Sequence, residues 1–266
     1  MIHRLDRLLP GPRVGGRESP EAYSRWEYES GQALLSDYPD LRLSLAGGRV
    51  LDIGCGPGGK SVVYAEEGAD VTGLDLEPSH AAAAAAFAGS RGCRLDVVTG
   101  DAALLPFVDE SFDLVVANDS MEHFADPEGT LNEISRVTRP GGRIFVFFTP
   151  WSSPLGSHLY DYIRTPWCHL VYSEGMLEKL LAIELEERGE PDPPAKAAGL
   201  IAAYREENNR IDIPRWRDIL GRAEELEIVF ERLRPPRFEF LAPLTRLPSI
   251  GRFVTGTVAA LLCKKE

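Results

Sequence analysis

Short apolar runs alternate with amphipathic or alanine-rich segments through the first half of the chain. The apolar runs are continuous, and they predict strands at residues 50–53, 70–75, 94–99, 111–117 and 143–148. The segments between them predict helices at residues 60–67, 78–89 and 127–138, the last closed by the stop signal Arg139-Pro-Gly-Gly142. Continuous apolar strands that alternate with helices indicate an α/β fold with a parallel sheet covered on both faces.

The segments before this core, which we place at residues 47–150, have a different pattern. Residues 1–19 are rich in arginine, glycine and proline, and we expect a poorly ordered tail there. Residues 20–46 spread aromatic and leucine side chains among polar ones, and they predict an N-terminal helical cap.

The alternation stops after residue 150. Residues 151–212 are aromatic-rich and then charged, and about two helices are expected between residues 174 and 210. We interpret residues 151–212 as a lid or acceptor-binding insertion. Residues 213–266 predict a helix opened by Pro214 and two strands that complete the core, at 226–233 and 254–262.

Composition and charge narrow the class of protein. The 266 residues are 44% hydrophobic and 26% charged, which is typical of an ordinary globular protein. The net charge of −12 argues against broad binding to nucleic acid, which requires a basic face. Arg4, Arg7, Arg13 and Arg17 lie close together in the sequence and could form a local basic patch, but a solvated flexible tail explains them better.

The cysteine spacing gives no metal or disulfide motif. Cys55, Cys93, Cys168 and Cys263 form neither a C-x-x-C pair nor a paired framework, and they are typical of the reduced thiols of a cytoplasmic protein. The N-terminus lacks an apolar signal core, and no segment approaches the ~20 apolar residues of a membrane span. The sequence leaves the oligomeric state open.

A glycine-rich loop follows the first predicted strand. Gly54, Gly56 and Gly59 fit the G-x-G-x-x-G spacing of dinucleotide sites, and Asp75 ends the second strand, where a carboxylate can bind ribose hydroxyls. This pattern alone permits a nicotinamide-dependent dehydrogenase. However, Asp52 lies two residues before the loop, where it would repel a pyrophosphate and would suit a cationic amino group. Asp101, after the third strand, could accept a hydrogen bond from an adenine amine.

Five motifs in order resemble the class I S-adenosylmethionine-dependent methyltransferases. They are Val50-Leu-Asp-Ile-Gly-Cys-Gly-Pro-Gly-Gly59, Val71-Thr-Gly-Leu-Asp-Leu76, Gly100-Asp-Ala-Ala-Leu-Leu-Pro-Phe107, Ser111-Phe-Asp-Leu-Val-Val-Ala117 and Leu131-Asn-Glu-Ile-Ser-Arg-Val-Thr-Arg-Pro-Gly-Gly142. The resemblance covers about residues 45–150. It implies a Rossmann-like, seven-stranded and mostly parallel sheet whose last strand is antiparallel, with S-adenosylmethionine as the cofactor.

The resemblance assigns the methionine part of the cofactor to the first loop. Gly54 and Gly56 would let the backbone lie against it, and Asp52 would face its amino group. Asn118, just after the fourth strand, would line the floor near the sulfonium, although it could also be a simple turn residue.

The resemblance assigns the adenosine part to the next two strand ends. Asp75 would hold the ribose hydroxyls, and Leu76 would pack on the adenine ring. Asp101 would accept from the adenine amine, with Ala102 beside it.

Two segments offer candidates for chemistry on the acceptor. Asp119, Glu122 and His123 resemble the residues that bind a divalent metal in ubiquinone-biosynthesis O-methyltransferases, and such a metal would lower the pKa of a phenol or enol. That group has Glu where this chain has Asp119, which has a shorter side chain. The Glu122-His123 pair is widespread in the family, where the histidine can be a structural residue near the cofactor. No metal site is therefore assigned.

The second segment is the aromatic stretch directly after the fifth strand. Trp151, Tyr160 and Trp167 could enclose a flat or apolar acceptor, or they could form the core of a small lid. His158 lies on a predicted loop and could be a general base. His169 is better explained as an interior histidine whose hydrogen bonds are satisfied.

The sequence therefore favours an enzyme that transfers a methyl group from S-adenosylmethionine to a small-molecule acceptor, through oxygen, carbon or nitrogen. The alternatives are an NAD(P)-dependent oxidoreductase and a non-catalytic module that binds the cofactor. The oxidoreductase is disfavoured by Asp52 and Asp101 and by the lack of a Tyr-x-x-x-Lys pair. Nothing in the sequence names the acceptor.

Overall fold

The computed structural model describes residues 6, 19–236, 240, 242–247 and 249–266. The chain divides into two compact units, which we call the core unit and the insertion unit. Among the described residues, the core unit comprises 19–148, 218–231 and 259–266, and the insertion unit comprises Asp6, 149–217 and those between 232 and 258. Apart from Asp6 and Ser19, the expected tail and its arginines lie outside the described residues.

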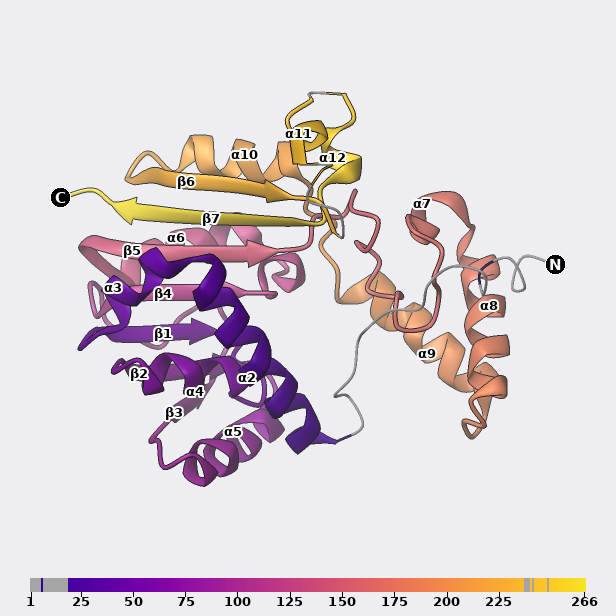
Figure 1. Ribbon diagram of the computed structural model, residues 1–266, viewed down its shortest axis with the longest axis horizontal. Helices are drawn as coiled ribbons and strands as arrows, with labels where there is room; N and C mark the ends of the chain where they lie inside the picture. Colours follow the sequence, from indigo (N-terminus) through magenta and orange to yellow (C-terminus); the bar gives the residue numbers. More distant parts are fainter. Residues whose placement is uncertain (1–5, 7–18, 237–239, 241, 248) are drawn as a thin grey trace. The chain divides into compact units, whose positions relative to one another are not determined.

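The core unit is built on a seven-stranded sheet with the order β3-β2-β1-β4-β5-β7-β6. The strands are β1 (Arg49–Ile53), β2 (Asp70–Asp75), β3 (Asp96–Thr99), β4 (Phe112–Asn118), β5 (Thr138–Phe148), β6 (Leu226–Arg234) and β7 (Thr257–Lys264). The pairs β1–β2, β1–β4, β2–β3 and β4–β5 are parallel. β7 runs against its neighbours (Figure 1), so the predicted mostly parallel sheet with an antiparallel last strand is confirmed.

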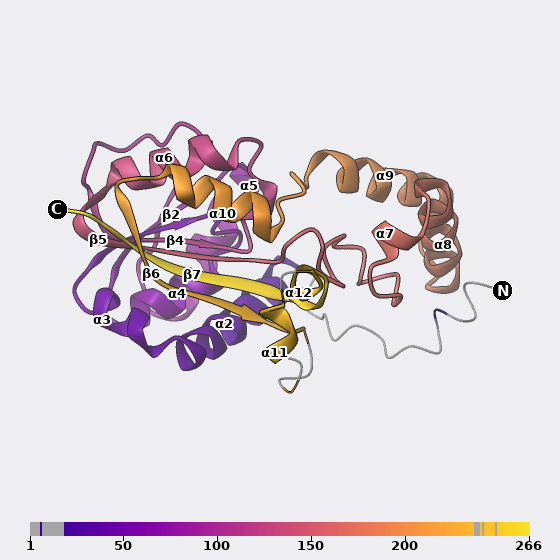
Figure 2. The ribbon, with the colours of Figure 1, turned by 90° about the horizontal axis from the view of Figure 1, so that it is seen from above.

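Helices cover both faces of this sheet. They are α2 (Pro20–Asp37), the short η1 (Pro39–Leu41), α3 (Arg42–Leu45), α4 (Gly59–Glu66), α5 (Pro78–Ser90), α6 (Pro127–Val137) and α10 (Ile213–Arg222). Figure 2 shows α2, α3 and α4 on one face of the sheet and α6 on the other. Residues 20–45 are therefore largely helical, and α2 packs on α4.

Local sequence explains where these helices begin. α2 starts with Pro20 at its first position, and the hydroxyl of Ser19 accepts a hydrogen bond from the N–H of Ala22 at 3.1 Å. α6 repeats this arrangement, because Pro127 opens it and Asp126 accepts from the N–H of Gly129 at 3.0 Å. Each cap satisfies an N–H group that has no partner within its helix.

The helix predicted at residues 127–138 ends at Val137, directly before the stop signal. The start of the next strand differs from the prediction: Arg139-Pro-Gly-Gly142 belongs to β5, which starts at Thr138 rather than Arg143. The register of β4 against β5 shifts here: Phe112 pairs with Thr138, whereas Leu114 pairs with Arg143. The extra residues therefore form an irregularity in the strand pair, which the positive φ of Gly141 (69°) permits.

The insertion unit contains mainly helices: α7 (Cys168–Val171), α8 (Glu174–Glu187), α9 (Pro193–Glu206), α11 (Ala242–Thr245) and α12 (Gly251–Val254). The two helices expected between residues 174 and 210 are α8 and α9. They pack together through an apolar core that includes Leu177, Leu181, Ala197 and Ile201. Asp6 accepts hydrogen bonds from the N–H groups of Arg164 (3.0 Å) and Thr165 (2.6 Å) in this unit.

The main apolar core lies between α2, α4 and the sheet. Tyr38 stacks on Phe230 at 5.9 Å between ring centroids and joins α2 to β6 through this core. Within the described residues, no helix combines the length and the apolar content that a membrane span requires. The four cysteines are free thiols, of which Cys55 and Cys168 are buried.

Candidate cofactor site

The glycine loop that follows β1 has a backbone that only glycine adopts readily. Gly54, Gly56 and Gly58 have φ angles of 71°, 52° and 78°. A Cβ on Gly54 would lie 2.8 Å from the Cβ of Ser120, so the loop passes directly against the chain that follows β4. The N–H groups of Gly54 and Cys55 donate to the carbonyl of Leu74 at 2.7 and 3.1 Å, which fixes the loop to the end of β2.

Asp75 lies at the end of β2, as the sequence predicts. Its Oδ2 accepts from the N–H of Gly56 at 2.8 Å, and its Oδ1 lies 2.9 Å from the N–H of Glu77 and 3.0 Å from Nδ1 of His80. The carboxylate is thus oriented by three groups around it. The adjacent Leu76 is 73% exposed, which leaves an open apolar side chain for a ring to pack on.

Asp52 is a buried carboxyl group beneath the loop. It is 2% exposed, and its Oδ2 accepts from the hydroxyl of Ser61 at 2.5 Å. Burial raises the pKa of Asp52 to about 6, against the opposing effects of Ser61 and Lys60. A carboxyl held in this way favours a cation as its neighbour and disfavours a phosphate.

A second buried carboxyl group belongs to Glu27 on α2, which the sequence analysis missed. Its Oε2 accepts from the N–H of Gly59, the first residue of α4, at 3.1 Å. Burial raises the pKa of Glu27 to about 7. The spacing of Glu27 from Ser24, Gly31 and Leu34 places it on the buried face of α2, and this signal could have identified it.

The close contact between α2 and α4 depends on Gly59. A Cβ at this position would lie 2.1 Å from the backbone oxygen of Ser24 and 2.6 Å from the Cβ of Glu27. The third glycine of the sequence motif therefore has a packing role, which brings the Glu27 carboxylate to the N-terminus of α4.

Lys60 and Asp119 form an ion pair that the sequence did not predict. Nζ of Lys60 lies 2.9 Å from Oδ2 of Asp119, and the two side chains are 9% and 41% exposed. Burial alone would lower the pKa of Lys60, but the carboxylates of Asp119 and Glu27 outweigh that effect and raise it. Asp119 has a φ of 56°, which is uncommon for a residue other than glycine.

The other predicted cofactor residues lie at neighbouring strand ends. Asp101 follows β3, and its Oδ1 accepts from the N–H of Ala103 at 2.9 Å, while Ala102 beside it is buried. Asn118 is buried at the end of β4, beside the hydroxyl group of Tyr64. The hydroxyl of Ser120 is also buried and has no hydrogen-bond partner within the described chain.

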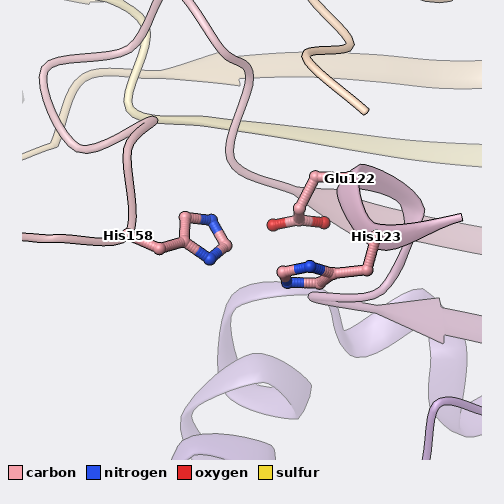
Figure 3. Close-up of side chains that lie close together, drawn as sticks. All are labelled: Glu122, His123 and His158. Carbon is pink, nitrogen blue, oxygen red and sulfur yellow. The ribbon is translucent and has the colours of Figure 1, made fainter. Parts of the chain in front are cut away.

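The candidates for acceptor chemistry are divided between the two units. Glu122 and His123 lie on η2 (Met121–His123), directly after β4, and Figure 3 labels both side chains. Glu122 is buried, whereas His123 is exposed. Asp119, the first acid of the candidate metal set, already has a cation as its partner in Lys60.

The two histidines of the insertion unit differ in their surroundings. Nε2 of His169 lies 2.7 Å from the carbonyl oxygen of Trp151, its ring contacts the Trp151 ring at 4.5 Å, and burial lowers its pKa. His158 is only half-buried, has a φ of 57°, and lies 6.1 Å from the Tyr160 ring.

The core unit is similar to known proteins. Residues 51–146 match the family described as a methyltransferase domain. Solved structures of similar fold include the PH0226 protein of Pyrococcus horikoshii OT3, with a TM-score of 0.53, 20% identity and coverage of 91% of each chain. A further neighbour, a SAM-dependent methyltransferase of Thermotoga maritima, has a TM-score of 0.50 and 19% identity over 93% of this chain and 91% of that one.

Relatives of known sequence match mainly the core unit. A demethylmenaquinone methyltransferase of Renibacterium salmoninarum is 32% identical over 168 residues, which are 62% of this chain and 64% of that one. A ubiquinone biosynthesis O-methyltransferase of Pseudomonas entomophila is 35% identical over 133 residues, 47% of this chain and 57% of that one.

An uncharacterized methyltransferase of Mycobacterium sp. (strain JLS) is 40% identical over 114 residues, and the match covers 43% of its length and 42% of this chain. The first relatives are thus matched over less than half of their length. Residues 51–146 thus match a methyltransferase domain, and the fold and the order of the motifs support a methyltransferase of the class I, S-adenosylmethionine-dependent type.

Proposed function

We propose that this protein uses S-adenosylmethionine to methylate a small-molecule acceptor. The observation that carries the proposal is the hydrogen bond from the N–H of Gly59 to the carboxylate of Glu27. It occupies the N-terminus of the helix that follows the glycine loop.

This bond distinguishes the two cofactors that the glycine spacing permits. In a dinucleotide site, the N–H groups at this helix N-terminus bind the pyrophosphate. Here a carboxylate of the chain itself accepts from one of them, and a second carboxyl group, Asp52, is buried beneath the loop. A pyrophosphate would meet like charge from both groups, whereas S-adenosylmethionine brings a sulfonium and an ammonium group.

The cofactor contacts expected from the sequence fit these surroundings. Asp75 is oriented by Gly56 and Glu77, and each of its oxygens can accept more than one hydrogen bond, which leaves capacity for ribose hydroxyls. Leu76 offers an exposed apolar side chain for adenine, and Asp101 follows β3 on the strand next to β2.

For the acceptor, we propose a flat or apolar metabolite. Trp151, His169 and Tyr204 form a group of aromatic rings in the insertion unit, with ring centroids 4.5 and 5.7 Å from that of Trp151. The quinone-related names of two relatives support the same chemical class. Attack through oxygen or carbon suits such an acceptor, and His158 is the proposed base where a proton must be removed.

The cofactor part of the proposal is tested by calorimetric titration with S-adenosylhomocysteine beside an identical titration with NADH. Micromolar binding of S-adenosylhomocysteine and no binding of NADH is the expected result. Binding of NADH alone would overturn the proposal in favour of an oxidoreductase.

The transfer itself is tested separately, with radiolabelled S-adenosylmethionine and a panel of demethylated quinols, phenols and amines. Label should appear in an aromatic or quinol product. Cofactor binding with no transfer to any member of the panel would favour a non-catalytic binding module.

A further inference from the structure

Lys60 is a buried cation in an unfavourable place for a cation. It is the second residue of α4, where the helix dipole disfavours positive charge, and its side chain is 9% exposed. Burial also disfavours an ammonium group unless partners compensate for the lost water. Neither local propensity nor apolar packing explains a lysine here, so its partners have to explain it.

These partners lie along the edge of the sheet where the cofactor is expected. Lys60 reaches from the helix after the glycine loop to Asp119, the residue after β4. β1 and β4 are adjacent parallel strands, and Ile53 pairs with Ala117, so the Lys60–Asp119 bond crosses the carboxyl ends of these two strands. Ligands of open α/β sheets bind at this edge.

The electrostatics of this edge make Lys60 the attractive group for an anion. Asp52, Asp119 and Glu27 are carboxyl groups, and Lys60 is the cation that acts on both Asp52 and Glu27. A ligand that carries a carboxylate here would be repelled by these acids unless its carboxylate met Lys60. The ammonium group has three N–H donors, and its hydrogen bond to Asp119 uses one of them.

A further feature beside Asp119 points to a ligand at this place. The adjacent Ser120 is 5% exposed, and its Oγ would lie 3.5 Å from a Cβ on Gly54. That hydroxyl has no hydrogen-bond partner within the described residues, although a buried hydroxyl normally has one.

We propose that Lys60 binds the carboxylate of the cofactor's amino acid part, while Asp119 keeps the ammonium group of Lys60 in position. This inference rests on the proposed function, because it assumes that the cofactor carries an amino acid. Lys60 thereby becomes a cofactor-binding residue in addition to those expected from the sequence, and Asp119 becomes its positioning partner rather than a metal ligand.

The test compares two ligands that differ only in the carboxylate. They are S-adenosylhomocysteine and its decarboxylated analogue, the 3-aminopropylthio derivative of adenosine, titrated into the wild-type protein, Lys60→Met and Lys60→Arg. Lys60→Met should weaken binding of S-adenosylhomocysteine by about tenfold or more, because a charge-assisted hydrogen bond is lost. Its affinity for the decarboxylated analogue should change by less than about twofold, and Lys60→Arg should recover most of the loss.

Controls separate this role from a purely structural one. Lys265→Met removes an exposed lysine of the same unit, and it should bind both ligands as the wild type does. An equal loss for both ligands in Lys60→Met would make Lys60 a structural residue and overturn the proposal.

The wild-type protein alone also provides a test that does not depend on the folding of a variant. Equal affinity of the wild type for the two ligands would overturn the role of Lys60. Failure of the wild type to bind S-adenosylhomocysteine at all would instead contradict the proposed function on which this role rests.

Discussion

The carboxylate of Glu27 accepts a hydrogen bond from the backbone N–H of Gly59 at 3.1 Å, and it thereby links α2 to the first turn of α4. This turn contributes the anion-binding N–H groups in many nucleotide sites. In this chain, the N-terminal cap supplies a negative group for one of them. The cap therefore contributes a side chain to the proposed cofactor site and is not only a cover for the sheet.

Replacement of this carboxylate should change how stability depends on pH. The pKa of Glu27 is raised from 4.5 to about 7 by burial, so between these values the folded protein binds more protons than the unfolded chain. The free energy of unfolding should then fall as pH rises from about 4.5 to 7. Glu27→Gln removes this contribution and keeps an oxygen that can accept from Gly59.

We expect Glu27→Gln to match the wild type near pH 4.5 and to be more stable by about 1–3 kcal/mol at pH 8. Urea denaturation at several pH values measures the difference. Glu29→Gln is the matched control, because Glu29 is an exposed residue of the same helix. Parallel stability profiles for Glu27→Gln and the wild type would show that the Glu27 carboxyl titrates normally in the fold.

Asp75→Ala should weaken binding of S-adenosylhomocysteine by about 10–100-fold, because the ribose loses a charged acceptor worth about 1.5–3 kcal/mol. The substitution also leaves the N–H of Gly56 without its partner, so Asp75→Asn should be measured beside it. Asp70→Ala, at the start of the same strand, should have no effect on affinity. Unchanged affinity in Asp75→Ala would remove Asp75 from the cofactor site.

Methyl transfer should persist after exhaustive chelation of divalent metal ions. Nζ of Lys60 lies 2.9 Å from Oδ2 of Asp119. A metal ion held by Asp119, Glu122 and His123 would therefore lie close to this ammonium group, and the two positive charges would repel each other. Activity is measured with and without a chelator, and then with Mg²⁺ or Zn²⁺ restored. Loss of activity on chelation and its recovery with metal would assign a metal to this site.

The sequence predicted the parallel core well because its strands are short, largely apolar runs that alternate with helical segments. Asp52 and Asp75 were identified because they interrupt or end such runs. The helical spacing could have indicated the burial of Glu27, but not its contact with Gly59, which is 32 residues away. Lys60 was missed because its partner Asp119 is 59 residues away, and no local pattern records such a contact.

The irregularity in β5 also depends on contacts that the local sequence does not record. Pro140 and the two glycines after it are typical of a turn, and local propensity favours a break there. Pairing of Thr138 with Phe112 nevertheless extends the strand through this segment, because the neighbouring strand offers hydrogen bonds at that position. Tertiary pairing thus outweighed the local signal.

His158 is the residue of the insertion unit that we expect to act as a base on the acceptor. His158→Ala should lower kcat by roughly 10²–10⁴-fold if it removes a proton from the acceptor, and affinity for S-adenosylhomocysteine should stay the same. His169→Ala is the comparison within the same unit. His169 is held by the Trp151 carbonyl, so its loss should lower stability more than it lowers the rate of transfer at a temperature where the variant is folded. A decrease of less than tenfold in His158→Ala would restrict His158 to packing or positioning of the acceptor.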